Sequence, residues 1–315
     1  MQKKIIALAI AGLASTAAFA QTNVTIYGIA DASITATSNL GATNGQTGFK
    51  VNSGTLSTSR IGFKGVEDLG NGLKALFVLE YGLGIDGSNP IGYSTTSSAA
   101  ARQQFVGLTG GFGTVVAGHL QTTGLDFTVA GSALGGSTGL GVAHTGTGLQ
   151  AAGATHLISA LAGGRHDNAV AYISPSFGGV VLAYNHARVS ESALTTNTTD
   201  AHGDLLSASY DNGPISAGAI YTKVTNPTTP ASDNLKEWGL RAGYNFGVAK
   251  LQSTYQQAKS DANANGSDKL WALSVSAPIG AKVAVIGEFA QNRIRSTGVN
   301  VKDNVSVTTL ATTYA

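Results

Sequence analysis

The feature that most constrains this chain is an alternation of apolar residues with small or polar ones, repeated in segment after segment. Between residues 73 and 81 the odd positions are all apolar: Leu73, Ala75, Phe77, Leu79 and Tyr81. The same two-residue period runs through 215–222, 237–244 and 271–276. This period indicates β-strands with one apolar face. Because the other face is too small and polar to fill an interior, we expect a barrel with its apolar face in lipid and its polar face around water.

Tight turns and long polar stretches alternate between these segments. Turns containing Gly, Pro or Asn are expected at 67–72, 110–113, 175–179, 211–214, 245–247 and 278–280. Longer stretches rich in Ser, Thr and Asn occupy 190–202, 224–234 and 260–267. Short turns at one end and long loops at the other are typical of transmembrane barrels. The pattern predicts about fourteen strands, from Val24–Ile34 to Asn304–Tyr314.

The start of the chain has the pattern of a secretory signal peptide. Lys3 and Lys4 form a basic region, Ile5–Leu13 is apolar, and Ala18-Phe19-Ala20 is a cleavage site of the A-x-A kind. We therefore assign 1–20 to the signal peptide and 21–315 to the barrel, and expect export through the Sec route.

Composition excludes several classes of protein. The chain has no cysteine, which excludes disulfides and Cys-ligated zinc. Its formal charge of +2 falls near neutrality once Lys3 and Lys4 are removed, and no basic patch is present, so we expect no nucleic-acid partner. No later segment is long and apolar enough for a membrane helix. His144, His156 and His166 lie too far apart for a local metal motif, and we expect neither metal nor cofactor.

The interval from Leu120 to His166 breaks the strand pattern. It is rich in Gly, Ala, Ser and Thr and shows little alternation. A long loop of this kind is usually functional, and here it can fold into the barrel and narrow the lumen. Within it, Gly135–Gly139 fits the G-x-S-x-G pattern of a hydrolase nucleophile elbow. That elbow needs a strand before Ser137 and a helix after it, and the sequence predicts neither. We therefore interpret the match as chance and predict no enzyme.

Several segments carry a family resemblance. The most specific is Ser59–Ala75, which reads SRIGFKGVEDLGNGLKA and covers a strand, its turn and the next strand. Val24–Asp31, Arg102–Gly113 and Asn168–Gly178 are further matches. Together, from Asn23 to the last residue, they resemble the Gram-negative porin family of β-proteobacterial type.

The resemblance implies a homotrimeric outer-membrane barrel of about sixteen strands whose third extracellular loop folds inward. By the same resemblance, a chain that ends at Thr312–Ala315 is about two strands short. The barrel over 21–315 is therefore expected to be incomplete at its C-terminus.

Carried over onto this sequence, the resemblance implies a basic pore wall formed by Arg60, Arg102 and Arg165. Strand parity agrees for Arg60, because Ile61 and Phe63 take the lipid side.

Other residues complete the predicted constriction. Lys64 and Lys74 share the inward face of Arg60, and Arg102 is expected to face inward with Phe105 on the opposite face. Asp126 is the only acid between Asp86 and Asp167, so the inward loop carries few countercharges. Arginines with so few matching carboxylates predict a modest preference for anions.

The predicted function is passive diffusion of small hydrophilic solutes and ions across the outer membrane of a Gram-negative bacterium. Expected partners are two further copies of the chain in a homotrimer, outer-membrane lipid and lipopolysaccharide, the outer-membrane assembly machinery, and small hydrophilic solutes and anions. A substrate-specific channel is the first alternative, and it requires stacked aromatic side chains in the lumen. An adhesin-type barrel that conducts no ions, or a truncated porin without function, are the others.

Overall fold

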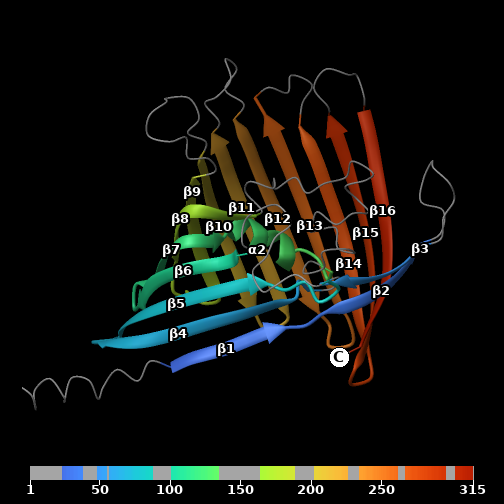
Figure 1. Ribbon diagram of the computed structural model, residues 1–315. Coiled ribbons are helices and arrows are strands. Elements are labelled where there is room, and N and C mark those ends of the chain that lie inside the picture. Colours follow the sequence, from blue (N-terminus) through green and yellow to red (C-terminus); the bar gives the residue numbers. More distant parts are fainter. Residues whose placement is uncertain are drawn as a thin grey trace, which may run out of the picture.

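The computed structural model describes residues 23–37, 48–54, 57–87, 101–134, 164–188, 202–225, 234–261, 267–295 and 302–314. Fourteen of the described strands form one antiparallel sheet in the order β1, β4 and then β5 to β16 without a crossover (Figure 1), which confirms the predicted fold class. The predicted signal peptide, 1–20, lies outside the described residues. β1 and β16 are the two edges of the sheet.

The elements follow one another along the chain with these bounds. The main sheet comprises β1 (Asn23–Ile29), β4 (Arg60–Gly70), β5 (Leu73–Gly82), β6 (Ala101–Gly110), β7 (Gly113–Gln121), β8 (Arg165–Ile173), β9 (Val180–Arg188), β10 (His202–Asn212), β11 (Ile215–Thr225), β12 (Leu235–Asn245), β13 (Lys250–Ser260), β14 (Asp268–Ile279), β15 (Val283–Arg295) and β16 (Lys302–Tyr314). A separate hairpin consists of β2 (Ala32–Thr37) and β3 (Gly48–Ser53), and a helix, α2 (Thr123–Ala130), follows β7.

Tight turns close the hairpins at one end of the sheet. Asn71 and Gly72 join β4 to β5 with φ angles of 53° and 78°. Positive φ at both central residues is the requirement of a two-residue type I′ turn, and Asn-Gly is the pair that meets it most easily. Each predicted tight turn overlaps such a connection. We call this end of the sheet the turn end, and the end with the longer connections the loop end.

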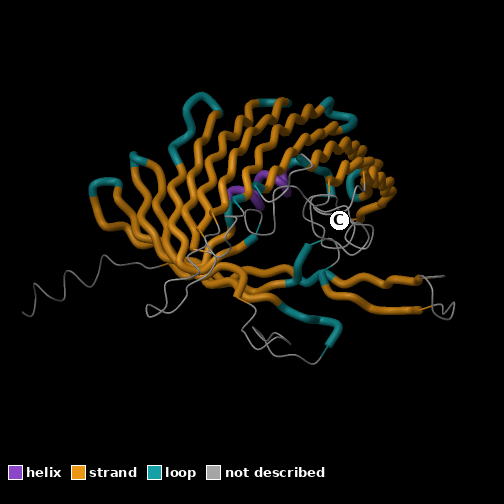
Figure 2. The backbone as a smooth tube through the Cα atoms, turned by 90° about the horizontal axis from the view of Figure 1, so that it is seen from above, coloured by secondary structure: helices purple, strands orange, loops and turns teal. Residues whose placement is uncertain are grey.

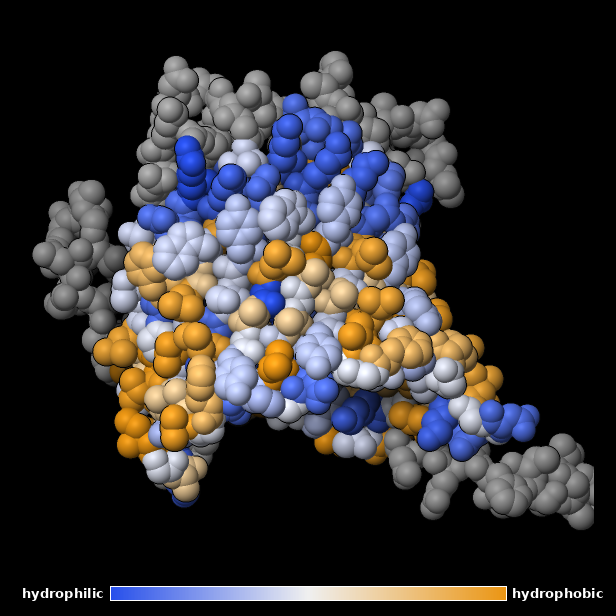
Figure 3. Space-filling view, turned by 180° about the vertical axis from the view of Figure 1, so that it is seen from behind, coloured by the Kyte–Doolittle hydropathy of each residue, from blue (hydrophilic) through white to orange (hydrophobic). Residues whose placement is uncertain are grey.

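One face of the sheet is apolar and exposed. Outward side chains such as Val106 and Leu206 are 65% and 56% exposed. Viewed from behind, this surface is hydrophilic at the loop end, then carries a row of aromatic rings, and then an apolar band (Figure 3). The outward aromatic residues nearest the loop end are Tyr184, Tyr221, Trp238, Tyr255 and Trp271. An apolar band bordered by aromatic rings is the lipid-facing surface of a membrane barrel, and it confirms the predicted alternation.

The inward face is less uniform than the alternation suggested. Over β11 to β15 it carries polar side chains such as Thr222, Gln256 and Ser274. Over β7 to β9, by contrast, it carries a buried apolar cluster: Val116, Leu120, Ala169, Ala171 and Ala187, with Leu76 and Phe105 packed against it. The prediction that inward residues are too small and polar to pack is therefore wrong for this part of the wall.

The segment after β7 turns into the interior of the sheet. Thr122 caps α2 by accepting a hydrogen bond from the Leu125 backbone N–H at 3.2 Å, which satisfies a donor that the first helical turn leaves free. Viewed from above, the sheet curves around this helix (Figure 2). No helix among the described residues is long and apolar enough to cross a membrane.

Contacts from successive strands hold this segment, Thr122–Leu134, which we call the inward segment. At its start the Thr123 N–H donates to Asn185 Oδ1 of β9 at 2.7 Å. Phe127 packs on Leu205 of β10 and Ile220 of β11. Further along, Gln252 of β13, Ser274 of β14 and Glu288 of β15 hydrogen-bond Ala130 O, Ala133 N and Ser132 Oγ, respectively.

The predicted inward folding of the interval Leu120–His166 is thus confirmed for its first part. The inward segment crosses the inner face of the sheet from β9 to β15. The middle of the interval, 135–163, with Ser137, His144 and His156, lies outside the described residues.

Candidate functional site

Glu80 of β5 lies between two of the predicted arginines at the loop end. Its Oε1 accepts a hydrogen bond from Arg102 Nε at 2.8 Å, and its Oε2 lies 3.5 Å from Arg60 Nε. The side chain of Glu80 is 6% exposed, whereas those of Arg60 and Arg102 are 23% and 14% exposed. One buried carboxylate therefore orients two guanidinium groups that remain in contact with the lumen.

Arg60 is also held by its own chain. Its Nη1 donates to the carbonyl of Thr58 at 3.1 Å and to Ser57 Oγ at 3.3 Å. Ser57 is fixed in turn because its N–H donates to Asp31 Oδ2 at 2.8 Å, at the break between β1 and β2. The junction between the small hairpin and the main sheet thus positions the first arginine.

Tyr27 of β1 supports the shared carboxylate from the other side. Its hydroxyl donates to Glu80 Oε2 at 3.0 Å. The ring lies over Gly62, where a Cβ atom would come within 2.3 Å of Tyr27 Cζ. A glycine on β4 is therefore needed for the ring to reach across the sheet. The Tyr27 ring covers the backbone of Gly62, which has no side chain of its own.

A β-bulge directs Arg102 toward the lumen. Glu80 pairs with Gln103, while Tyr81 pairs with Ala101, so Arg102 is an extra residue on β6. Bulges re-aim side chains in this way. Phe105 packs on the inward apolar cluster and so lies on the luminal face together with Arg102. The prediction that Phe105 takes the opposite face is wrong, because strict alternation does not hold across the bulge.

Arg165 joins the arginines to the inward segment. It pairs with Gln121 at the loop end of β7 and β8, and its Nη2 donates to Gln121 Oε1 at 2.8 Å. Gln121 Nε2 donates to Asp126 Oδ1 at 2.5 Å. Arg60, Glu80, Arg102 and Asp126 are all close enough to interact electrostatically with Arg165. The structure therefore brings the predicted arginines and the predicted acid into one cluster.

Asp126 is the acid that the inward segment contributes. Its side chain is exposed to solvent, but protein surrounds it on several sides. This desolvation raises the pKa of Asp126, while the hydrogen bond from Gln121 and the charge of Arg165 act in the opposite direction. The carboxylate thus takes up a proton at a higher pH than an ordinary aspartate.

The two predicted lysines lie at different distances from the cluster. Lys64 is exposed, and its Nζ is 5.4 Å from the centre of the Tyr27 ring. Lys74 pairs with Asp68 and with Thr109 beside the short turns. Because Arg60 pairs with Gly82 at the other end of β5, about 27 Å of strand separates Lys74 from the arginines. The structure does not bring Lys74 to the cluster.

The opposite side of the lumen carries carboxylates, but they are buried. Glu237 of β12 is 0% exposed and accepts a hydrogen bond from Thr222 Oγ1 at 2.7 Å. Glu288 of β15 is 3% exposed and accepts the hydrogen bond from Ser132 of the inward segment. These acids hold the wall and the segment together and present little charge to the water.

Glu80 is the site residue that the sequence analysis missed. It occupies an even position of the alternating segment 73–81, and therefore the same inward face as Lys74. The β4–β5 pairing places it opposite Gly62, between Arg60 and Lys64. The inward direction of Glu80 was readable from the alternation, but its partner was not. A register counted from the Asn71-Gly72 turn gives Phe63, and the irregularity between Asp68 and Gly70 shifts the pairing by one residue to Gly62.

Comparison with known proteins agrees with this geometry. The family model for Gram-negative porins matches residues 7–315. Outer membrane porin protein 32 of Delftia acidovorans is 35% identical over 295 residues, which cover 92% of this chain and 80% of that protein. An outer membrane porin protein of Bordetella pertussis is 29% identical over 279 residues, which cover 81% of this chain and 69% of that protein.

Solved structures show the same architecture. An anion-selective porin from Comamonas acidovorans superposes with a TM-score of 0.74 at 27% identity, covering 93% of this chain and 84% of that one. OmpF of Salmonella typhi, solved with daunomycin, has a TM-score of 0.65 at 13% identity, a likeness of fold alone. With the fold, the lipid-facing surface and the inward segment, these matches place the chain among outer-membrane channel proteins: it belongs to the Gram-negative porin family.

Proposed function

We propose that the chain forms a general-diffusion pore with a modest preference for anions, in which Arg60, Arg102 and Arg165 form the basic wall and Asp126 is the facing acid. One observation carries the proposal: the guanidinium groups reach the lumen, whereas Glu237 and Glu288 on the other wall are buried. Three cations against Glu80 and Asp126 leave a net charge of +1 in the cluster, and Lys64 adds to it.

The size of the preference follows from Coulomb's law. In a water-filled lumen one unit charge about 8 Å from an ion contributes about 0.5 kcal/mol, so the cluster changes the anion-to-cation ratio by a few-fold. Salt screens this effect, because the Debye length is about 10 Å at 0.1 M. A few-fold bias without tight binding suits diffusion, since a solute must also leave the pore.

The relatives support the sign of this preference. The structural neighbour from Comamonas acidovorans is described as anion-selective. The exposed apolar surface also suits the proposed homotrimer, contact with outer-membrane lipid and lipopolysaccharide, and handling by the assembly machinery. Diffusion requires no chemistry on the solute, and we assign no catalytic residue.

A substrate-specific channel is disfavoured by the aromatic residues that face inward. Tyr27 is tied to Glu80, and Phe105 and Phe127 are packed in apolar clusters. Within the described part of the wall these rings do not form a stacked track along which a sugar or nucleobase could slide.

Swelling of protein-loaded liposomes distinguishes the two functions. We expect uncharged sugars to enter at rates that fall smoothly with size and do not saturate with concentration. An organic anion should enter a few times faster than a cation of equal size, because the cluster is cationic. Saturation by one sugar that also blocks the others would contradict general diffusion.

A further inference from the structure

A further arginine, Arg241 of β12, lies on the inner face of the sheet, apart from the arginine cluster. Its side chain has inward parity, because Leu240 and Ala242 on either side of it are exposed on the apolar outer face. Its partners in the register are Gly218 of β11 and Thr254 of β13. The arginine is therefore on a different part of the wall from Arg60, Arg102 and Arg165, which belong to β4, β6 and β8.

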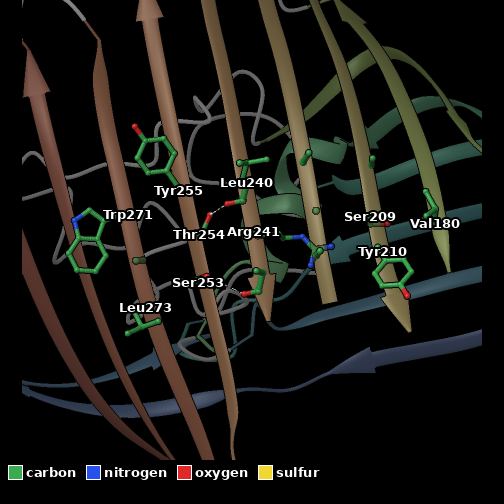
Figure 4. Close-up of a pocket in the computed structure, with 16 residues that line it drawn as sticks. Val180, Ser209, Tyr210, Leu240, Arg241, Ser253, Thr254, Tyr255, Trp271 and Leu273 are labelled. Atoms are coloured by element: carbon green, nitrogen blue, oxygen red, sulfur yellow. Dashed lines mark hydrogen bonds between the residues drawn. The ribbon is translucent and has the colours of Figure 1, made fainter. Parts of the chain in front are cut away.

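Glycines make room for the Arg241 side chain to lie flat on the wall. A Cβ atom at Gly218 would come within 2.6 Å of Arg241 Nε and within 3.1 Å of its Cζ. Gly243, two residues along β12, is covered in the same way by the hydroxyl of Ser216. In Figure 4 the nitrogen atoms of Arg241 lie over β11, with α2 behind them. The guanidinium group and the Ser216 hydroxyl thus lie on neighbouring glycines of the same two strands.

The guanidinium group of Arg241 is not neutralised by an ion pair with any described residue. Its Nε is buried and has no hydrogen-bond partner. Asp211 of β10 attracts it, but from beyond the distance of an ion pair. The nearby carbonyl of Ala130, at the end of α2, already accepts a hydrogen bond from Gln252. A buried charged donor of this kind costs free energy unless an acceptor satisfies it.

Arg241 lines a cavity of about 350 Å³ between the wall and the inward segment, which we call the Arg241 cavity. Its lining includes Val129 and Ser132 of the inward segment and Asp211, Ser216 and Lys250 of the wall. Ser132 donates its hydroxyl to Glu288. The remaining donors are therefore the hydroxyl of Ser216 and the two cations. Two cations against the single acid Asp211 leave a net charge of +1 around the cavity.

A second cavity, of about 290 Å³, also has Arg241 in its lining and extends along β9 and β10 to Asp126. Asp126 is held by Gln121 and is part of the arginine cluster. Lys250, in contrast, is exposed at the end of β13 that joins a tight turn. Arg241 therefore lies between the arginine cluster and the turn end of the sheet.

We propose that the Arg241 cavity binds a doubly charged oxyanion, of which inorganic phosphate is the simplest, with two oxygens on the Arg241 guanidinium group and its second charge toward Lys250. The parallel N–H donors of a guanidinium group fit two oxygens of one anion, which selects an oxyanion over chloride. Binding in the millimolar range still lets the anion leave toward either end. The inference rests on the proposed function only in that solutes enter the lumen, because binding here can be measured without ion flow.

The chain has no cysteine, so a single introduced thiol reports the occupancy of the cavity. Val129→Cys places the thiol in its lining, and Thr114→Cys places a control thiol at the turn end of β7, outside it. The full chain in detergent is treated with an anionic methanethiosulfonate reagent, and mass spectrometry gives the rate of modification. Phosphate, acetate and chloride are compared as potassium salts at equal ionic strength.

We expect phosphate to slow the modification of Val129→Cys, with half of the full effect at a few millimolar and saturation above it. Acetate should need about tenfold more, because it carries one charge, and chloride should give no saturable effect. The modification of Thr114→Cys should not respond to phosphate beyond the effect of ionic strength.

Further substitutions in the Val129→Cys chain test the named residues. Arg241→Gln should raise the phosphate concentration for half protection at least about tenfold, and Lys250→Gln about threefold. Gly218→Ala keeps both charges but displaces the guanidinium group, and should also weaken protection. Lys74→Gln removes a cation from the turn end of β5 and should leave protection unchanged. Ion conductance of each variant checks that it has folded.

Three results would overturn the proposal: protection that does not saturate, equal protection by chloride, or full protection by phosphate in both Arg241→Gln and Gly218→Ala. An equal loss in Lys74→Gln would likewise reduce the effect to the general field of the lumen. The reversal potential separates this site from the proposed function. Saturable protection in a pore that prefers cations would refute the anion preference alone, whereas an anion preference without protection would refute only this site.

Discussion

On the β4–β8 side of the lumen the arginines of the cluster reach water, whereas on the β11–β15 side two carboxylates are buried. Arg60 and Arg102 are 23% and 14% exposed, while Glu237 and Glu288 are 0% and 3% exposed. A count of luminal charges alone would therefore underestimate the positive field that a solute meets. The inward segment contributes to the difference at Glu288, which accepts a hydrogen bond from Ser132, whereas Glu237 is buried against Thr222 of the neighbouring strand.

Release of the inward segment from the wall should reduce the difference between the two sides of the lumen more than any other change. Phe127 is 4% exposed between Leu205 and Ile220, and Phe127→Ala should cost about 3–5 kcal/mol of packing. Release uncovers Glu288, so single-channel conductance should rise and the anion preference should fall. Phe112→Ala, at a 47% exposed turn position, is the matched control and should change neither quantity. Conductance equal to that of the wild type in Phe127→Ala would show that the segment does not narrow the lumen.

Removing one carboxylate from each wall tests the comparison directly. Glu80→Gln deletes a charge beside the open arginines and should raise the anion-to-cation permeability ratio about twofold. Glu237→Gln keeps an acceptor for Thr222 and deletes a buried charge, so the ratio should stay near that of the wild type. Reversal potentials in dilute potassium chloride measure both. Equal shifts in the two variants would contradict the distinction between open and buried walls.

Lowering the pH should increase the net positive charge on the arginine side of the lumen, because Asp126 becomes protonated. The pKa of this carboxyl is raised by desolvation, so it gains its proton above the pH at which an ordinary aspartate does. Protonation removes a negative charge, and the anion preference should therefore increase, by up to about twofold, as the pH falls. Asp126→Asn should show the larger preference already at neutral pH and lose this step. A falling anion preference on acidification would refute the assignment.

The smallest effect is expected from the lysines. Lys64→Gln, near Tyr27, should lower the anion preference by less than about twofold. Lys74→Gln removes the same charge at the turn end, beside Asp68, and should have almost no effect. If Lys74→Gln has the larger effect on the reversal potential, the narrow part of the lumen lies nearer the turn end.

Much of the fold was predictable because alternate residues of a strand lie on opposite faces, so the local sequence shows which face is apolar. The alternation in 237–244, the Asn71-Gly72 turn and the inward direction of Arg60 all follow from short stretches of chain. The break in alternation after Leu120 likewise predicted the inward segment. Helix α2 was not predicted, although Thr122 with Asp126 in the first turn is a recognisable start signal.

What could not be predicted depends on pairing between strands. The bulge at Arg102 exists only in the register of β6 against β5, and it reverses the parity that Phe105 suggested. Burial of Glu288 depends on Ser132, which is 156 residues away in the chain. Local sequence patterns carry no information on such long-range contacts. These contacts, however, decide which charges a solute meets.

The most direct test of the account is the reversal potential of the refolded protein in a planar bilayer, between dilute potassium chloride solutions that differ about tenfold in concentration. The wild type should give the sign of an anion-preferring pore. The variant with Arg60→Gln, Arg102→Gln and Arg165→Gln should lose that sign or reverse it, because Glu80 and Asp126 remain. Wild-type cation preference, or an unchanged potential in the triple variant, would contradict the claim that these arginines set the selectivity.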